Sequence, residues 1–196
     1  MKKSQRTALK RASEPAKPKN QPAAVERPGS WHLARTETER LLSDFEFRLE
    51  RLAQAYYRWK AACLAAVCDV PLTGDDVAVL NVVRMGDEPK RLSEVGQLLN
   101  RVDVPNLQYA ARKLVRAGLI ETEGGSSRKE TRYRATATGR SVTEAYAALR
   151  AATLPPMLDA LDGWAANSET ASIHLDLISS LYAQAAQAAI TRRHQP

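Results

Sequence analysis

The sequence predicts a mostly α-helical protein with one small β-hairpin near the middle of the chain. Apolar residues recur every three or four positions over long stretches at both ends, as they do on one face of a helix. Two shorter helical patterns follow one another at 92–99 and 104–117, and two strand-like segments joined by a Gly-rich turn come next, at 119–134. The sequence therefore places a compact module between long helices.

Residues 1–30 are expected to form a disordered basic tail. They contain eight Lys or Arg and two Glu, a net charge of +6, and only Leu9 and Val25 as large aliphatic residues. Such a segment buries too little apolar surface to offset the entropy lost on ordering. It is either a solvated tail or an arm that holds DNA, because basic tails bind nucleic acid.

Residues 31–70 are expected to form an N-terminal dimerisation helix, running from about Thr36 to Cys68. Its apolar stripe consists of Leu42, Phe45, Leu49, Leu52, Tyr56, Trp59, Cys63 and Val67. A helix of this length spans ~50 Å, which exceeds what a small domain needs. A second copy of the same chain is the simplest partner for the overhang.

Residues 71–140 contain the compact module. Thr73 is expected to cap a short helix that buries Val77, Leu80 and Val83 and ends at Gly86. Two further helices follow, 92–99 and 104–117, with a turn at 100–103. The second has Pro105 at its start, where proline costs little, and Gly118 at its end, where a left-handed cap is favoured.

A strand at 119–123, a turn at 124–127 and a returning strand at 131–134 complete the module, and Lys90-Arg91 is expected to add a short third strand. A helix-turn-helix joined to a β-hairpin is a winged helix, whose usual function is binding duplex DNA. The full prediction is a winged helix-turn-helix DNA-binding domain flanked by long N- and C-terminal dimerisation helices.

Residues 141–196 are expected to supply the C-terminal dimerisation helices. Thr138 is predicted to cap a helix from Gly139 to Thr153, which Pro155-Pro156 then breaks or kinks. Residues 157–166 are predicted to be helical, Asn167-Ser168 to interrupt them, and a last helix to run to about Arg192. The stripe of this last helix contains Ile173, Leu177, Leu181 and Ala185.

The positive charge of the chain is unevenly distributed. Residues 31–196 carry a net charge of only +1, yet residues 90–140 carry 11 basic and 5 acidic side chains, a net +6. A basic patch on one module is expected where a protein meets a phosphate backbone. A winged helix used only for protein contacts is the alternative, but it gives no general reason for clustered arginines.

The second helix of the module has an inward stripe of Leu107, Ala110, Ala111 and Leu114. Its outward side chains are Asn106, Gln108, Tyr109, Arg112, Lys113 and Arg116. Asn and Gln match adenine with two hydrogen bonds, so Asn106 and Gln108 are expected to contact bases together with Tyr109. Arg112 suits either guanine or phosphate, and Arg101 and Arg116, nearer the helix flanks, suit phosphate.

The turn between the strands is followed by four basic residues: Arg128, Lys129, Arg132 and Arg134. Strand alternation places Arg132 and Arg134 on one face and Tyr133 on the other. A basic hairpin tip enters a minor groove or straddles phosphates. We expect Arg128 to enter the groove and Lys129 and Arg132 to hold phosphates; a merely solvated turn is the alternative.

Residues 73–140 resemble the MarR family of bacterial winged-helix regulators. The residues that carry the resemblance are Leu92-Ser93-Glu94-Val95-Gly96-Gln97-Leu98-Leu99, Val104-Pro105-Asn106-Leu107, Arg112-Lys113-Leu114-Val115-Arg116-Ala117-Gly118-Leu119-Ile120, Arg128-Lys129 and Thr136-Ala137-Thr138-Gly139-Arg140. The resemblance implies a homodimer that binds a palindromic operator and often releases it when a small phenolic or other ligand binds or a cysteine is oxidised. It maps groove-reading positions onto Pro105, Asn106, Gln108 and Tyr109, and the wing arginine onto Arg128. Ser127 stands where the family usually has an aspartate that braces this arginine.

Aromatic residues on the flanking helices have two interpretations. Tyr56, Trp59 and Tyr146 are either packing residues or the walls of a pocket for a small aromatic or other ligand. Cys63 lies on an apolar stripe and is expected to be a small buried hydrophobe, whereas Cys68 near the helix end is expected to be more accessible.

No catalytic constellation is recognisable in the sequence. The three histidines are far apart and form no metal-ligand spacing with either cysteine, and no Gly-rich phosphate loop follows a strand. No apolar run approaches the ~20 residues that span a bilayer. We expect a cytoplasmic, non-enzymatic DNA-binding protein without metal or cofactor.

Overall fold

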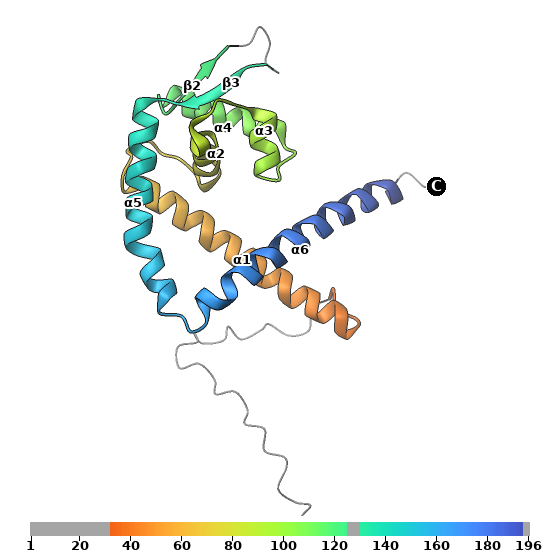
Figure 1. Ribbon diagram of the computed structural model, residues 1–196. Helices are drawn as coiled ribbons and strands as arrows, with labels where there is room; N and C mark the ends of the chain where they lie inside the picture. Colours follow the sequence, from red (N-terminus) through yellow and green to blue (C-terminus); the bar gives the residue numbers. More distant parts are fainter. Residues whose placement is uncertain (1–31, 125–129, 194–196) are drawn as a thin grey trace, which may run out of the picture. The chain divides into compact units, whose positions relative to one another are not determined.

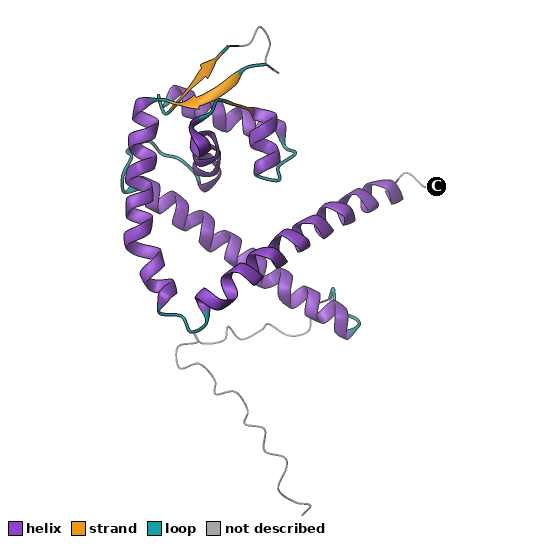
Figure 2. Ribbon diagram, in the orientation of Figure 1, coloured by secondary structure: helices purple, strands orange, loops and turns teal. Residues whose placement is uncertain are grey.

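The structure is a computed structural model that describes residues 32–124 and 130–193 (Figure 1). The described residues up to Met157 form one compact unit, and those from Leu158 onward form a second. Mostly helices and one three-stranded antiparallel sheet make up the fold, as predicted (Figure 2). The elements are α1 (Glu37–Ala65), α2 (Gly74–Arg84), the short 3₁₀ helix η1 (Met85–Asp87), β1 (Lys90–Arg91), α3 (Leu92–Leu98), α4 (Val104–Arg116), β2 (Ile120–Glu123), β3 (Arg132–Ala135), α5 (Ala137–Asp159) and α6 (Trp164–Arg193).

Helix α1 begins in a capping box. The Thr36 hydroxyl accepts from the Glu39 backbone N–H, and the Glu39 carboxylate accepts from the Thr36 backbone N–H, so the helix start is fixed from both sides. Only the last part of the predicted apolar stripe is buried, at Cys63, next to the equally buried Leu64. Leu42 and Leu52, nearer the N-terminus, are exposed in this single chain.

Helices α2, α3 and α4 pack around one apolar core. The Thr73 side chain caps α2 as predicted, with Asp76 as the reciprocal partner. Side chains of α4 close the core, because Leu107, Ala110, Ala111 and Leu114 are at most 3% exposed. The core as a whole contains Val79, Leu80, Val83, Val95, Leu107, Ala110, Ala111, Leu114, Leu119 and Ile120.

The sheet has the strand order β1-β3-β2, and both pairs of strands are antiparallel. Tyr133 on β3 lies opposite Lys90 on β1 and Thr122 on β2, and its side chain packs against the core. Gly118, between α4 and β2, adopts a positive φ of 68°, a conformation that glycine allows without a steric penalty. The turn from α4 into the wing is therefore formed as predicted.

Helix α5 differs from the prediction at both ends. Its N-terminal cap is Thr136 rather than Thr138: the Thr136 hydroxyl accepts from the Gly139 N–H at 3.0 Å and donates to the Gly118 carbonyl at 2.6 Å. Of the two predicted effects of Pro155-Pro156, a break or a kink, the break is wrong, because α5 continues to Asp159. Proline has a helical φ, so it can remain within the helix, although each proline lacks the N–H for one helical hydrogen bond and its ring crowds the carbonyl four residues earlier.

Helix α6 is one continuous element of 30 residues, so the predicted interruption at Asn167-Ser168 is also wrong. The interruption between helices lies earlier, between the end of α5 at Asp159 and the start of α6 at Trp164, and Gly163 there has a φ of 76°. Asn167 stays in the first turn of α6 and donates from its side-chain amide to the Gly163 carbonyl at 2.8 Å. Ile173, Leu177 and Leu181 lie along α6, and all three are exposed in this single chain.

Candidate nucleic-acid interface

The turn that leads into α4 is held by close backbone packing. The Arg101 N–H donates to the Gly96 carbonyl at 2.8 Å, and Asn100 takes up a positive φ of 51°. A Cβ added at Gly96 would lie 3.0 Å from the Arg101 carbonyl oxygen and from a methyl group of Leu107. Helices α3 and α4 therefore meet at a fixed separation, which sets the direction in which the start of α4 points.

The outer face of α4 has the polar and cationic character that the sequence predicts. Tyr109 is 58% exposed, and Gln108 is partly exposed. Other exposed side chains on this face are Pro105, Asn106, Arg112 and Arg116. One helix therefore carries hydrogen-bonding groups near its N-terminal end and two guanidinium groups farther along.

A hydrogen-bond network surrounds the first turn of α4. The Arg101 guanidinium binds the Asp103 carboxylate through Nε at 2.9 Å and Nη2 at 2.6 Å, and it reaches Asp75 on α2 at 3.3 Å. The Asn106 side-chain amide donates to Asp103 at 3.0 Å. Arg101, followed by Asn106, holds the pKa of the Asp103 carboxyl far below its usual range, so this group remains ionised. The predicted phosphate contact Arg101 is thus already paired with two carboxylates.

Lys113 lies on a different side of α4 from the one predicted. Its ammonium donates to the Asp76 carboxylate at 2.7 Å, and this carboxylate is 5% exposed. Asp76 also accepts from the Thr73 backbone N–H and hydroxyl. Lys113 therefore compensates a buried charge instead of facing outward, and the sequence could not reveal a partner 37 residues away.

The described part of the wing presents fewer uncommitted cations than the sequence suggests. Arg132 donates to the Pro89 carbonyl at 3.0 Å, and Arg134 pairs with Glu121 and Glu123 on the neighbouring strand. Arg128 and Lys129, predicted to enter the minor groove and hold phosphate, lie outside the described residues.

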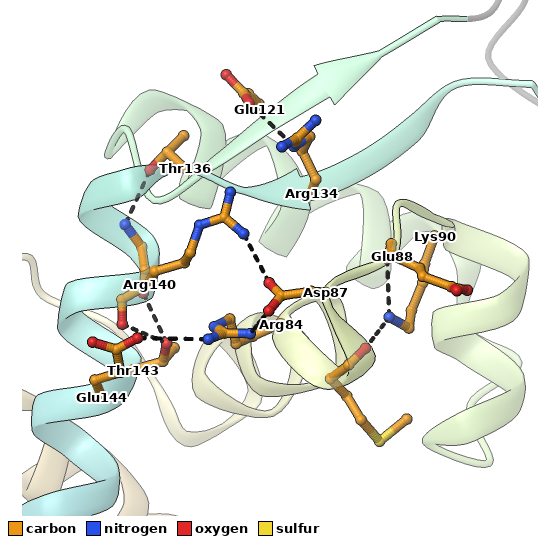
Figure 3. A network of polar contacts seen from close by, with 12 residues as sticks. Arg84, Asp87, Glu88, Lys90, Glu121, Arg134, Thr136, Arg140, Thr143 and Glu144 are labelled. Carbon is orange, nitrogen blue, oxygen red and sulfur yellow. Dashed lines mark hydrogen bonds and ion pairs between the residues drawn. The ribbon is translucent and has the colours of Figure 1, made fainter.

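Figure 3 shows a polar network that joins the end of α2 to the start of α5. The Asp87 carboxylate bridges Arg84 at 2.7 Å and Arg140 at 2.8 Å, and Arg84 also approaches Glu144 at 3.6 Å. Asp87 has a positive φ of 59°, so the backbone holds it in an uncommon conformation at the point where both guanidinium groups meet. The network ties the end of α2 and η1 to the first turns of α5.

Two interpretations were open for Tyr56, Trp59 and Tyr146, packing or a pocket. All three line one pocket, and Trp59 and Tyr146 also belong to a core cluster at the end of α1. The ring centroids of Tyr56 and Tyr146 each lie 6.4 Å from that of Trp59. The pocket has a volume of about 410 Å³. It is lined by Tyr56, Trp59, Asn81, Arg84, Thr143, Glu144, Tyr146, Ala147, Arg150 and Leu154. Sequence reasoning missed Arg84 and Arg150, although Arg150 follows Tyr146 by one helical turn and so shares its side of α5.

Other groups offer little chemistry in the part of the chain that the structure describes. Cys63 is buried, and burial raises the pKa of its thiol, whereas Cys68 is partly exposed. No cluster of three or more His, Cys, Asp or Glu side chains in residues 32–124 and 130–193 could hold a metal ion. Over the same residues, no helix has the length and apolar character needed to cross a bilayer.

Comparison with known families identifies the module. Residues 72–139 match the family model of the winged helix DNA-binding domain. This part of the chain has the winged helix fold. The match begins just before the Thr73 cap of α2 and ends just after the Thr136 cap of α5, so the winged helix domain contains α4, the whole sheet and the network around Asp103.

Solved structures extend the similarity beyond the winged helix domain. Reduced AbfR of Staphylococcus epidermidis bound to DNA has a TM-score of 0.61 and 19% identity, over 77% of this chain and 99% of AbfR. Sco5413, a MarR family transcriptional regulator from Streptomyces coelicolor, has a TM-score of 0.56 and 19% identity, over 71% and 95%. MOSR of Mycobacterium tuberculosis in complex with DNA has a TM-score of 0.54 and 17% identity, over 73% and 96%. No curated protein sequence matches the chain. The chain thus has the fold of MarR-family regulators, as the sequence resemblance predicted.

Proposed function

We propose that the protein is a transcriptional regulator of the MarR type, which binds a palindromic operator as a homodimer and acts as a repressor. The observation that carries the proposal is the outer face of α4: a winged helix domain exposes Asn106 and Tyr109 near the start of this helix and Arg112 and Arg116 farther along. AbfR and MOSR, which have the same fold, have been solved with DNA bound.

The proposed roles follow from position and chemistry. Asn106, Gln108 and Tyr109 contact base edges next to Pro105, because residues near the N-terminal end of a recognition helix reach the major groove. Arg112 contacts base or phosphate, and Arg116, Lys129 and Arg132 contact phosphate. Arg128 enters the minor groove. Two α4 helices related by a two-fold axis would meet half-sites one helical turn apart, ~34 Å.

Exposed apolar side chains on α1 and α6 support the proposed homodimer. Leu42 and Leu52 on α1 and Ile173, Leu177 and Leu181 on α6 are all at least 49% exposed in the single chain. Large apolar side chains exposed along a helix mark an interaction site. We therefore assign 31–70 and 141–196 to dimerisation and 71–140 to DNA binding, and we place the protein in the cytoplasm without a catalytic role.

The pocket between Trp59 and Tyr146 supports a small-molecule effector. It combines aromatic walls with two guanidinium groups, Arg84 and Arg150, and one carboxylate, Glu144. An aromatic ligand with an acidic group suits this lining. Such a ligand would relieve DNA binding only if its affinity differs between the DNA-bound and free conformations.

Binding to random duplex DNA at increasing salt tests the proposal. The logarithm of the affinity should fall linearly with the logarithm of salt concentration, and Arg112→Ala and Arg116→Ala should each reduce the slope by about 0.9 if each side chain neutralises one phosphate. Arg40→Ala, which removes an arginine paired with Glu37 and Asp44 on α1, is the matched control and should leave the slope unchanged. Absence of binding at low salt would favour the alternative, a winged helix domain that contacts proteins. Gel filtration with light scattering tests the dimer separately.

A further inference from the structure

We infer that Arg101 and Asp103 are positioning residues for base readout, which together fix the carboxamide of Asn106 in a single orientation at the start of α4. The inference rests on the proposed function and assigns Arg101 a role other than the phosphate contact that its charge suggests. Neither residue needs to touch DNA for this role, because both act through Asn106.

The first step is the chemistry of the acceptor. Asp103 lies two residues after Arg101 and three before Asn106, and its carboxylate binds both side chains. An ionised carboxylate accepts hydrogen bonds and donates none. The group of Asn106 that faces it must therefore be the NH₂, at 3.0 Å, and the carboxamide oxygen must point the other way. The negative charge of Asp103 therefore fixes which of its two orientations the Asn106 carboxamide takes.

The second step is what this orientation leaves for a base. An asparagine that contacts adenine with two hydrogen bonds accepts from the N6 amino group through its oxygen and donates to N7 through one N–H. The NH₂ group has two hydrogens, and Asp103 takes one of them. The second hydrogen and the oxygen remain for the base in a fixed order. The correct donor-acceptor order is thus set before DNA arrives, and the entropic cost of ordering the side chain is reduced.

The third step is the geometry that holds Asp103 itself. Asp103 occupies the N-cap position of α4, where an aspartate usually accepts from backbone N–H groups of the first turn. Its side chain makes no such capping bond, and the Asp103 backbone carbonyl accepts from the N–H groups of Asn106 and Leu107 instead. The two-point bond from Arg101 draws the carboxylate to the side of the helix where Asn106 lies. Because the planar guanidinium matches a carboxylate with two parallel bonds, a lysine at 101 could not hold it in the same way.

The fourth step explains why the network does not repel DNA. A carboxylate beside a phosphate backbone is unfavourable, but the positive charge of Arg101 lies at 2.6–2.9 Å from Asp103 and offsets it locally. The Arg101 side chain is 18% exposed, and all three of its guanidinium nitrogens already donate to carboxylates. Its third contact, to Asp75 at 3.3 Å, ties it to α2 and away from the outer face of α4.

The test measures base discrimination with the full chain. A preferred site is first selected from random duplex DNA with the wild-type protein, and each base pair of that site is then changed in turn. Asn106→Ala should lose discrimination at one A·T pair, by about 5- to 150-fold. Asp103→Asn, Arg101→Ala and Arg101→Lys should lose discrimination at the same pair, by about two- to tenfold, which corresponds to releasing one ordered side chain. None of these three should change the salt slope, whereas a direct bond from Arg101 to a phosphate would make its removal reduce the slope by about 0.9.

Two controls separate positioning from charge and from folding. Asp75→Asn removes a carboxylate that contacts Arg101 but has no bond to Asn106, so it should change affinity for all sequences alike and keep discrimination. In an Asn106→Ala background, Asp103→Asn should cause no additional loss at the A·T pair, because no carboxamide remains to be oriented. Discrimination is a ratio measured within one variant, so a lower fraction of folded protein cancels from it.

The outcomes are distinguishable. Retained discrimination in Asp103→Asn overturns the inference, as does an equal loss at every position of the site. The salt slope of DNA affinity gives a second outcome. If Arg101→Ala reduces this slope and Arg101→Lys restores it, Arg101 contacts a phosphate, and its positioning role is overturned. Failure of the wild-type protein to bind duplex DNA refutes the proposed function, and the inference falls with it.

Discussion

Replacement of Lys113 by methionine should lower the stability of the fold and leave the salt dependence of DNA binding unchanged. Lys113 and Arg112 are neighbours on α4, but the first donates to the buried Asp76 carboxylate and the second is exposed. Methionine keeps most of the apolar stem of lysine and removes only the ammonium. The variant therefore isolates the loss of the charge that compensates Asp76.

The magnitude follows from the surroundings of Asp76. Removal of one partner of a buried ion pair costs about 3–5 kcal/mol when the remaining charge is uncompensated. Here Asp76 keeps two hydrogen bonds from Thr73, and the Lys113 side chain is 23% exposed, so we expect a smaller loss of about 2–3 kcal/mol. For a chain of this size, that loss lowers Tm by about 4–12 °C.

Urea unfolding at one fixed protein concentration measures the effect, since association of chains would otherwise shift the midpoint. Asp76→Asn in combination with Lys113→Met should cost less than the sum of the two single changes, because neither residue then leaves the other unpaired. Arg112→Met is the matched control, with an expected change within about ±0.5 kcal/mol in stability and a reduced salt slope for DNA. Wild-type stability in Lys113→Met, or a salt slope reduced as in the Arg112 variant, would refute the assignment of Lys113 to Asp76.

Three further predictions use other contacts. Gly139→Ala should destabilise the domain by at least about 1–3 kcal/mol in urea unfolding, because a Cβ there would lie 1.9 Å from the Leu119 carbonyl oxygen; unchanged stability would contradict this packing. In native protein at pH 8, iodoacetamide should modify Cys68 and spare Cys63, whose burial raises its thiol pKa and lowers the thiolate fraction; mass spectrometry of the labelled peptides decides. Base discrimination should stay constant from pH 8 down to pH 5, because the lowered pKa of Asp103 keeps this carboxylate ionised over the whole range. A loss of discrimination between pH 6 and 5 would show that another titrating group controls the orientation of Asn106.

The sequence predicted the features that depend on residues close together in the chain. Helix periodicity and backbone preferences predict the apolar stripe of α4, Pro105 in its first turn and Gly118 just after its end, and each is present in the structure. The strands that pair around the wing follow from alternation and a Gly-rich turn. These local signals place the outer face of α4 before any coordinates are known.

Features that depend on tertiary contacts were less predictable. Thr136 and Thr138 are equally good caps by residue type, and the close approach of Gly139 to the Leu119 carbonyl selects Thr136. The exposure of Lys113 was wrongly predicted because Asp76, its partner, comes from a different helix. Arg84 and Arg150 join the aromatic pocket residues only through the packing of α2 and α5.

The contact between Gly139 and Leu119 has a mechanical consequence. The first residues of α5 touch the backbone at the entry to β2 with no side chain between them, and the Thr136 hydroxyl donates to the carbonyls of Gly118 and Leu119 in the same place. Side chains between two segments can change rotamer when the segments shift, but two backbones in direct contact have no such freedom. Helix α5 also carries Tyr146, which lines the pocket. A tilt of α5 would therefore displace the start of β2, because the two segments are in direct backbone contact.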